Sequence, residues 1–423
     1  MTSLLSNLIQ DNVPTIITFV FLIIVSSYYV LLFKKTKKPD KVKTYSSVTV
    51  IIPAHNEEKY IRECIESVKG ADFEGEKEII VVDDGSIDKT SEIVSSFEGI
   101  KLIKSKHSGK SASLNRALMV ATGELVAVVD GDSFIHKHSL QEVVNEVGGD
   151  NVAAACCPVR VRNRNKFVCI WLHIGEIYFS LLRHLFSKVN ANITTPGPLS
   201  VYRKKELMDI GGFSTEGFSE DADVTIRLIR EGYKIGYAEH AIAETNMPHD
   251  FKGFFRQRTR FARGLINLLK RHMQFNNKTI DYYTMPIFLF GYFQAVFMGS
   301  LSIYQITTGY YQYFFSKGIY FNFLVLKFLF EWFSVIGFAR WMFSIVTGQS
   351  ALSALAILGI VSTLLTYPLY IISILKFDKK FDFLHFLAIF FMAPFWLVIM
   401  GIHIVCIPEY FAKKQDNIWK KNE

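Results

Sequence analysis

The sequence has few cysteines, and none of them has the spacing of a metal or redox motif. Its five cysteines include no Cys-x-x-Cys pair and no cysteine and histidine pattern with ligand spacing. We therefore expect neither a structural zinc site nor a disulfide framework. Cys156 and Cys157 lie in an apolar run, which favours a place in the core. The sequence also lacks internal repeats and low-complexity segments, so a repeat architecture is not expected.

A strong imbalance of charge is absent as well. Lys plus Arg number 47 and Asp plus Glu number 39, which gives a net charge of +8. This excess does not by itself indicate nucleic acid, because the cytoplasmic flanks of membrane segments also collect Lys and Arg. Of the 423 residues, 50% are hydrophobic, and 37 are Phe and 19 are Tyr. This composition is rich for a soluble protein and predicts a membrane part.

Residues 13–33 form an uncharged apolar stretch of transmembrane length. No basic region precedes it and no small-residue cleavage site follows it, so we expect a membrane anchor and not a signal peptide. A run rich in lysine follows between Lys34 and Lys43. The positive-inside rule places this end of the anchor, and the region after it, in the cytoplasm.

Further apolar stretches lie between residues 284 and 407, and each of the four is long enough to span a bilayer. They cover roughly residues 286–304, 321–343, 352–375 and 383–407. Glu331 and Arg340 make the second stretch the weakest candidate. Four spans return the tail, residues 408–423, to the cytoplasm, in agreement with its lysines. The lysines at positions 376, 379 and 380 would then lie outside, which disagrees with the positive-inside rule. If one of the stretches lies on the membrane and does not cross it, the topology changes.

Between about residues 46 and 249 the pattern changes to strands that alternate with helices. Apolar runs predict strands over residues 48–52, 78–82, 100–104, 125–129 and 152–158. Longer helices are predicted over residues 167–187 and 220–230. This alternation is typical of an α/β domain with a mostly parallel sheet and right-handed crossovers.

Carboxylates follow two of the predicted strands directly. Asp83 and Asp84 end one strand, and Asp130 and Asp132 follow another with Gly131 between them. In open α/β sheets, ligands bind at this end of the strands. Nearby carboxylates repel one another unless a cation compensates them, and a divalent metal with oxygen ligands would also hold phosphate oxygens. Taken alone, the Asp-Gly-Asp motif does not exclude a plain acidic turn after a strand.

A third group of carboxylates opens the helix predicted over residues 220–230. These are Glu220, Asp221 and Asp223. Negative charge in the first turn of a helix favours the helix dipole, and this effect alone is a sufficient structural reason for the group.

Residues 250–275 form an amphipathic and basic segment. Arginines recur at helical spacing, and phenylalanines and leucines supply an apolar face. A helix of this kind can lie in the membrane interface. Gln257, Arg260 and Phe261 share one face of the predicted helix.

In this order and spacing, the motifs resemble those of membrane-embedded family 2 glycosyltransferases. The resemblance extends from Val48 to about Gly264 and covers both acidic strand ends, the Glu-Asp pair and the basic helix. The region is similar to hyaluronan, chitin and poly-N-acetylglucosamine synthases. Residues 196–203, Pro-Gly-Pro-Leu-Ser-Val-Tyr-Arg, resemble a stretch of hyaluronan and chitin synthases. The resemblance implies an α/β catalytic domain of the GT-A (Rossmann-like) type beside α-helical transmembrane segments.

The resemblance also implies how a donor is held. Asp83 and Asp84 match the pair whose carboxylate hydrogen-bonds the uracil of a UDP-sugar. Asp130 and Asp132 match the Asp-x-Asp that holds Mg²⁺ or Mn²⁺ on the diphosphate, where the metal neutralises charge on the leaving UDP. Lys110 matches a lysine near the donor phosphates. The alternative for Lys110 is a solvated lysine at a helix start, because lysines are usually exposed.

On the acceptor side, Asp221 matches the general base of the family. The base takes the proton from the acceptor hydroxyl as that oxygen attacks the anomeric carbon, and a single displacement inverts the configuration. Gln257, Arg260 and Phe261 match the family's Gln-x-x-Arg-Trp motif, in which the Trp lies under the acceptor sugar. Arg260 would offset pyrophosphate charge. Phe261 replaces the Trp; it still stacks on a sugar face but lacks the indole N–H.

We therefore expect a processive, inverting glycosyltransferase in the cell membrane, with its catalytic domain in the cytoplasm. The resemblance implies transfer of N-acetylglucosamine from a UDP-sugar to a growing polysaccharide. The C-terminal spans would form a channel, because sugar hydroxyls cannot cross hydrocarbon cheaply. The alternative is a non-processive enzyme that acts on a lipid carrier or glycolipid, which Phe261 favours slightly. The intact acidic motifs argue against an inactive scaffold, and basic residues crowded at membrane flanks argue against a nucleic-acid partner.

Overall fold

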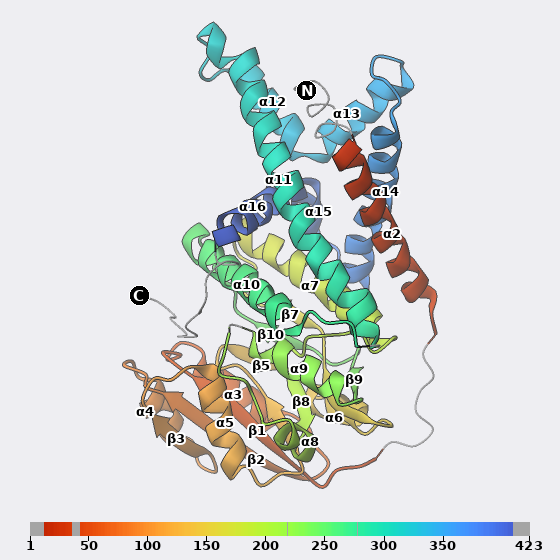
Figure 1. Ribbon diagram of the computed structural model, residues 1–423. Helices are drawn as coiled ribbons and strands as arrows, with labels where there is room; N and C mark the ends of the chain where they lie inside the picture. Colours follow the sequence, from red (N-terminus) through yellow and green to blue (C-terminus); the bar gives the residue numbers. More distant parts are fainter. Residues whose placement is uncertain (1–11, 36–42, 218, 277, 409–423) are drawn as a thin grey trace.

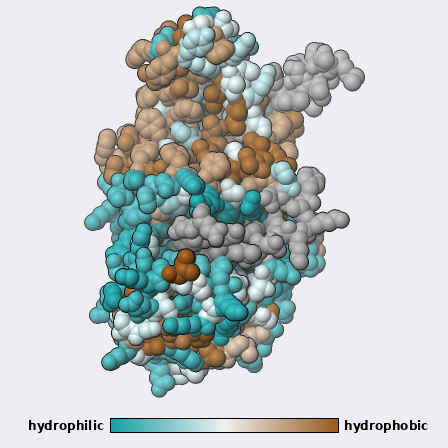
Figure 2. Space-filling view, turned by 90° about the vertical axis from the view of Figure 1, so that its left-hand side faces the viewer, coloured by the Kyte–Doolittle hydropathy of each residue, from teal (hydrophilic) through white to brown (hydrophobic). Residues whose placement is uncertain are grey.

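The computed structural model describes residues 12–35, 43–217, 219–276 and 278–408. It has an α/β part and a part made of long helices (Figure 1). The lysine run after the expected anchor lies mostly outside the described residues, and so does the tail from residue 409 onward. Hydrophobic residues gather over the helical part, and hydrophilic residues gather over much of the α/β part (Figure 2).

A seven-stranded sheet forms the centre of the α/β part, with the strand order β3-β2-β1-β4-β8-β6-β9. Its strands are β1 (Ser47–Ala54), β2 (Glu76–Asp84), β3 (Lys101–Ser105), β4 (Leu125–Val128), β6 (Val152–Cys156), β8 (Ser200–Arg203) and β9 (Lys234–Tyr237). β8 runs antiparallel to both of its neighbours, and the other pairs are parallel. The mostly parallel sheet predicted from the sequence is therefore confirmed.

Helices cover both faces of this sheet. Because side chains alternate along a strand, Val50 and Ile52 of β1 face one side and Ile51 faces the other. The first side packs against α3 and α6, and the second packs against α5 and α9. The helices of this part are α3 (Ile61–Gly70), α4 (Thr90–Ser95), α5 (Lys110–Val120), α6 (Ser139–Val147), α8 (Lys204–Asp209) and α9 (Glu220–Arg230).

A small three-stranded sheet lies next to the acidic turn that follows β4. It consists of β5 (Ser133–Ile135), β10 (Ala243–Thr245) and β7 (Val159–Val161), with β10 in the middle. β5 begins directly after Asp132 and pairs antiparallel with β10. This pairing holds the downstream end of the acidic turn while β4 holds its upstream end, so the turn is anchored on both sides.

Nine further α-helices lie in the rest of the described chain. They are α2 (Val13–Phe33), α7 (Phe167–Ser187), α10 (Phe251–His272), α11 (Met285–Tyr313), α12 (Phe323–Phe333), α13 (Val335–Val346), α14 (Ala354–Phe377), α15 (Phe383–Phe390) and α16 (Met392–Val405), with the short helices η2 (Ile280–Thr284) and η3 (Phe315–Lys317). Among the residues that the structure describes, three helical segments are long and apolar enough to cross a membrane: α2, the continuous segment from η2 to η3, and α14. The pair α15 and α16, bent by 55°, would count as a fourth.

The apolar stretch at residues 321–343, expected as one of four C-terminal spans, is not a single helix. It is divided between α12 and α13, which meet at Ser334, where the backbone is extended. Glu331 and Arg340 form an ion pair across this break. Pairing within the protein lowers the cost of two charges beside apolar surroundings. The stretch named the weakest of the four candidates is thus two short helices in the structure, and the number of C-terminal spans stays a prediction.

The helices α7 and α10 lie between the sheet and the candidate spans (Figure 1). They coincide with the helices predicted over residues 167–187 and within 250–275. One cluster of buried residues runs through this layer. It includes Ile51 and Ile80 of the sheet, Leu172 of α7, Leu369 of α14 and Phe395 of α16. The sheet and the membrane helices therefore share one hydrophobic core.

Candidate active site

The structure brings four of the predicted segments to one edge of the main sheet. The end of β2 supplies Asp83 and Asp84, and the turn after β4 supplies Asp130 and Asp132. Lys110 opens α5, and Glu220 and Asp221 open α9. Parallel strands deliver their carboxyl ends to the same edge, which is the physical reason for this meeting.

Lys110 links two of these segments. Its Nζ atom lies 2.6 Å from Oδ1 of Asp130 and 3.0 Å from Oε1 of Glu220. Burial alone would lower the pKa of Lys110, but the charges of Asp130 and Glu220 outweigh it and raise that pKa. Only 18% of the Lys110 side chain is exposed. The alternative of a solvated lysine at a helix start does not match this position.

The turn that holds Asp130 is closely packed. The Asp130 N–H donates to the carbonyl of Gly197 at 3.1 Å. A Cβ atom at Gly197 would lie 2.3 Å from Oδ2 of Asp130 and 2.6 Å from Nζ of Lys110. The backbone of the Pro196–Pro198 segment can approach the acidic turn only because this residue is glycine.

The donor set suits a hard divalent cation. Burial and the charge of Asp132 raise the pKa of Asp130, although Lys110 opposes them. Asp130 and Glu220 contact the amine of Lys110, and the charges of Asp132 and Asp221 act on the same group, so negative charge is left in excess. Carboxylate oxygens in such excess are the ligands that Mg²⁺ and Mn²⁺ prefer. Asp130 and Asp132 therefore fit a divalent metal.

Asp221 has the properties of a proton acceptor. It is half-buried at the start of α9, and its Oδ1 accepts a hydrogen bond from the Ala222 N–H at 2.8 Å. Burial and the nearby charge of Glu220 raise the pKa of Asp221 to about 6. A carboxylate with this pKa is ionised at neutral pH and is a stronger base than an ordinary aspartate.

Asp84 differs from the arrangement that the resemblance implies. It is buried, and its oxygens accept from the Ser108 N–H at 3.0 Å and the Gly109 N–H at 2.8 Å. Nδ1 of His107 also lies 2.9 Å from Oδ2 of Asp84. Asp83 is buried too and accepts from the Ser86 N–H at 2.9 Å. In this structure Asp84 holds the loop that leads to Lys110.

Of the three residues predicted on α10, Arg260 is linked to this site by its charge. Burial would raise the pKa of Glu220, but the charge of Lys110 and, more weakly, that of Arg260 keep it low. The ring of Phe261 is 43% exposed and lies 5.6 Å from the Arg260 guanidinium. Gln257 donates from Nε2 to Sδ of Met247 at 3.1 Å. Arg260 and Phe261 therefore remain accessible to a ligand.

Asp223 has a different role from its neighbours. It is buried and pairs with Arg227 at 2.8 Å and with Nε2 of His272 at 2.9 Å. Since His272 belongs to α10, this carboxylate ties α9 to α10. The sequence analysis accounted for Asp223 by the helix dipole alone, and the structure shows that it also joins two helices.

Glu220 and Arg258 were missed as candidate site residues by the sequence reasoning. The contact between Glu220 and Lys110 joins residues 110 positions apart, and no local pattern predicts it. Arg258 is 7% exposed, although it lies in a basic helix. Helical spacing did contain a signal here, because Arg258 is four residues from both Phe254 and Ala262, which are buried.

A second group of metal-ligand type side chains lies where α7 meets α14 and α15. His173, Asp378 and His385 are buried, and their ligand atoms lie within 4.8 Å of one another. The Val161 N–H donates to Nδ1 of His173 at 3.2 Å, so Nε2 carries the hydrogen and faces Asp378. Arg164 donates two hydrogen bonds to Asp378, at 2.8 and 3.0 Å. This arrangement is a hydrogen-bonded ion pair between the two parts of the protein, and it disfavours a metal ion.

The sequence of this chain was compared with family models and with known proteins. Residues 49–211 match the family model described as glycosyl transferase family 2. The probable glycosyltransferase YdaM of Bacillus subtilis is 30% identical over 277 residues, which cover 61% of this chain and 65% of that protein. The poly-beta-1,6-N-acetyl-D-glucosamine synthase of Staphylococcus aureus (strain COL) is 26% identical over 260 residues, which cover 58% and 61%. The match thus spans less than two thirds of the length of these relatives.

Among solved structures, the fold is similar to that of the mannosyltransferase PcManGT from Pyrobaculum calidifontis, in complex with GDP-Man and Mn²⁺. The TM-score is 0.57, and the match covers 93% of this chain and 99% of the other at 18% sequence identity. At this identity the likeness concerns the fold alone. The α/β part accordingly has the GT-A type of fold, accompanied by apolar helices that could span a membrane.

Proposed function

The chain carries a family 2 glycosyltransferase domain, and from this premise we propose that it is an inverting UDP-sugar glycosyltransferase that extends a polysaccharide. The observation that carries the proposal is the half-buried cluster in which Lys110 bridges Asp130 and Glu220 while Asp221, beside them, has a raised pKa. Such a cluster supplies both an anion-compensating group and a base at one sheet edge.

On the donor side, Asp130 and Asp132 would hold Mg²⁺ or Mn²⁺. The metal would neutralise negative charge on the diphosphate of the donor. The Mn²⁺ bound with GDP-Man in the Pyrobaculum structure supports a divalent metal. Lys110, which contacts Asp130 and Glu220, and Arg260, whose charge acts on Glu220, would balance the phosphate charge. Asp84 would position the nucleotide through the loop it holds.

On the acceptor side, Asp221 would take the proton from the attacking hydroxyl. One displacement at the anomeric carbon needs one base, and its raised pKa makes Asp221 suited to this task. The exposed ring of Phe261 would support the acceptor sugar by stacking. Gln257, whose Oε1 has no hydrogen-bond partner in the described part of the chain, would accept from an acceptor hydroxyl.

The proposed sugar is N-acetylglucosamine, and the proposed product is a polymer that crosses the membrane. The similarity to the staphylococcal poly-beta-1,6-N-acetyl-D-glucosamine synthase supports this choice. The catalytic domain would lie in the cytoplasm, because the lysine-rich run follows α2 directly. A cysteine placed at Lys35 should then resist an impermeant thiol reagent in intact cells. Labelling of that cysteine from outside would contradict the orientation.

The test uses the full-length protein in lipid nanodiscs with Mn²⁺. UDP release is measured across a panel of UDP-sugars, and product size is measured by gel electrophoresis. We expect release with UDP-N-acetylglucosamine and a ladder of long products. A single addition would favour transfer to a lipid carrier or glycolipid. The observation that supports this alternative is Phe261, whose ring is smaller than that of the Trp in the family motif. Absence of UDP release with every donor would overturn the proposed function.

A further inference from the structure

The contacts at the two ends of the bent helix pair α15 and α16 show how this pair lies in the membrane. α15 has 8 residues and α16 has 14, so at about 1.5 Å per residue the helices extend roughly 12 and 21 Å. Together they are long enough to cross a hydrocarbon layer of ~30 Å. Length alone therefore permits both a broken span and an element that returns to the side from which it enters.

The beginning of α15 is held beside the α/β part. Asp378, in the turn between α14 and α15, accepts hydrogen bonds from Arg164 at 2.8 and 3.0 Å. Nε2 of His385, in the first turn of α15, lies 3.4 Å from the same carboxylate. In the same turn region, Lys376 forms an ion pair with Glu239, which lies between β9 and β10. The end of α14 and the start of α15 are therefore on the side of the α/β part.

The end of α16 lies on that side as well. Cys406 is buried in a small cluster with Ala262 and Ile266 of α10. Near the start of α16, the ring of Phe395 lies 6.0 Å from the ring of Phe254, near the start of α10. The two helices thus advance in the same direction, and α16 runs along α10. Since α10 is tied to α9 of the α/β part by an ion pair, α16 does not lead away from this side.

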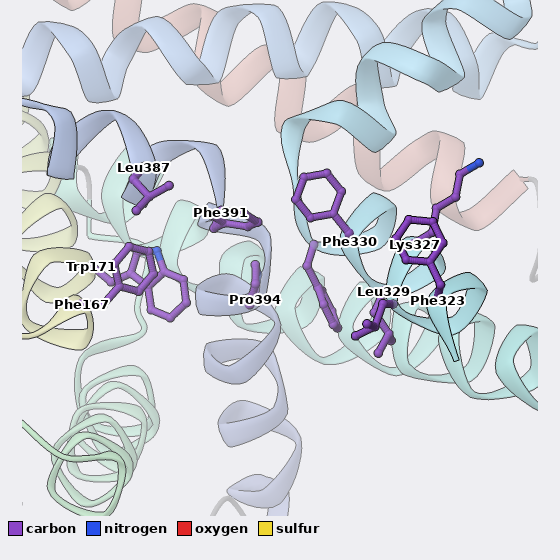
Figure 3. Close-up of a pocket in the computed structure, with 11 residues that line it drawn as sticks. Phe167, Trp171, Phe323, Lys327, Leu329, Phe330, Leu387, Phe391 and Pro394 are labelled. Carbon is purple, nitrogen blue, oxygen red and sulfur yellow. The ribbon is translucent and has the colours of Figure 1, made fainter. Parts of the chain in front are cut away.

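The bend between α15 and α16 lies about halfway across the membrane. α12 starts on the far side, where the long segment from η2 to η3 ends, and its 11 residues extend roughly 16 Å. Near the end of α12, the ring of Phe330 lies 5.8 Å from the ring of Phe391 at the bend. Figure 3 shows Phe330 and Phe391 facing one another, with Leu387 of α15 beside Trp171 of α7. The roughly 16 Å of α12 and 12 Å of α15 together nearly make up the hydrocarbon thickness of ~30 Å.

We infer that α15 and α16 form a re-entrant element. It enters the bilayer from the side of the α/β part, bends near the middle and returns to the same side. Its outer surface contacts the hydrocarbon of that leaflet, because α15 exposes Phe383, Leu384 and Phe386, and α16 exposes Val405. Apolar side chains gathered in this way indicate a lipid-covered surface. The inference goes beyond the proposed function and does not depend on the sugar or on the acceptor.

The distribution of lysines agrees with this arrangement. The crossings among the described residues are then α2, the segment from η2 to η3, and α14. The lysines of residues 34–43, those at positions 376, 379 and 380, and those of the tail all lie on one side. The disagreement with the positive-inside rule, which four C-terminal spans would produce at residues 376–380, is removed.

The re-entrant element also supports the helix that carries the predicted acceptor residues. The ring of Phe395 lies 6.0 Å from the guanidinium of Arg258, and Arg258 precedes Arg260 and Phe261 on α10. A spanning α16 would leave α10 after its first turns, whereas a re-entrant α16 packs along it as far as Ile266. The element therefore fixes the depth of α10 relative to the bilayer.

The first test compares the two ends of the pair by thiol labelling of the full-length protein in intact and permeabilised cells. Lys35→Cys, Lys317→Cys, Lys379→Cys and Lys413→Cys each add one thiol, and the wild-type protein, whose cysteines are buried, gives the background. We expect an impermeant reagent to label Lys317→Cys on one side and the other three on the opposite side. Lys379→Cys and Lys413→Cys on opposite sides would overturn the inference, and so would Lys317→Cys on the side of Lys379→Cys.

This comparison separates the inference from the proposed function. If Lys35→Cys, Lys379→Cys and Lys413→Cys are all labelled from outside the cell, the proposed cytoplasmic orientation fails and the re-entrant element remains.

The second test measures the contact between α16 and α10 by cross-linking in the membrane. Native Cys406 supplies one thiol, and Ile266→Cys or the milder Ala262→Cys supplies the other. Lys270→Cys, an exposed position one turn further along α10, is the matched control. With a short membrane-permeable bismaleimide, we expect mass spectrometry to find a cross-link to Cys406 from position 266 or 262 and little from position 270. A spanning pair would carry Cys406 ~30 Å away, so the absence of a cross-link from both positions would overturn the inference.

Discussion

Replacing Asp221 by asparagine should separate catalysis from stability. Asparagine keeps the shape of the side chain and removes the proton acceptor. Loss of a general base usually lowers the rate by ~10²–10⁴-fold, so we expect sugar transfer to fall by that factor. Binding of UDP and Mn²⁺ should hardly change, because in the proposed site Asp130, Asp132 and Lys110, and not Asp221, would hold that end of the donor.

The structure also predicts the sign of the stability change. The pKa of Asp221 rises from 3.8 to about 6 on folding, and each pH unit corresponds to about 1.4 kcal/mol. The ionised carboxylate is therefore unfavourable in the folded protein by at most about 3 kcal/mol, and solvent at this half-buried side chain reduces the figure to about 1–2 kcal/mol. Asp221→Asn removes this cost, so the variant should melt at the same temperature or higher.

The pH dependence follows from the same pKa. Between about pH 6 and 4 the folded state binds the Asp221 proton more tightly than the unfolded chain, so this group favours folding more as the pH falls. The gain in stability of Asp221→Asn over the wild-type protein should be largest above pH 6 and should disappear toward pH 4. Wild-type activity should fall about tenfold per pH unit below pH 6, as the base becomes protonated.

The assay pairs UDP release with calorimetry for UDP and Mn²⁺ and with thermal unfolding in detergent. Glu231→Gln is the matched control, since Glu231 is an exposed carboxylate at the other end of α9. It should change none of the three measurements. Near wild-type transfer by Asp221→Asn would refute the role of Asp221 as the base. A clear fall in the melting temperature of this variant would refute the predicted sign of the stability change. Asp223 is unsuitable as a control because its ion pairs join two helices.

Three further predictions concern other parts of the structure. Chelation by EDTA should abolish UDP release, and Asp132→Asn should weaken Mn²⁺-dependent UDP binding in calorimetry; full activity in EDTA would exclude the metal site. Gly197→Ala should lower donor affinity at least tenfold, because its Cβ would clash with Asp130, and unchanged affinity would show that the loop yields easily. Asp378→Asn should destabilise the protein by about 3–5 kcal/mol, since it leaves Arg164 without its buried partner; an unchanged melting temperature in detergent would contradict this.

Elements with a strong local pattern could be predicted from the sequence. The strands that end at Asp84 and before Asp130 are apolar runs, and they are found where expected. The helix predicted over residues 167–187 has those bounds in α7. The strands β5, β7 and β10 were not predicted, because each has three residues and owes its existence to partners more than 80 positions away. Local propensity carries no information of that kind.

The candidate site shows the same division. The acidic motifs are visible in the sequence because each lies within a few residues of a strand end. The ion pair of Lys110 with Glu220 and the closed environment of Asp84 depend on loops that only the fold brings together. The hydropathy pattern could not predict the break at Ser334, because hydropathy depends on composition and not on backbone conformation. The structure shows extended backbone at Ser334 and an ion pair between Glu331 and Arg340 across the break.

The hydrophobic core that joins the sheet to the membrane helices has a consequence for synthesis. Ile51 is made early, but Leu369 and Phe395, which belong to the same buried cluster, are made more than 300 residues later. The helices α5 and α9 cover the Ile51 face of the sheet first, but Leu172 of α7, in the same cluster, must wait for α14 and α16. At ~5–20 residues per second, one face of α7 stays uncovered for roughly 10–45 s. During this interval a chaperone or the membrane surface must cover that face. A fragment that stops before α14 should therefore aggregate as it leaves the ribosome, however well its strands can pair.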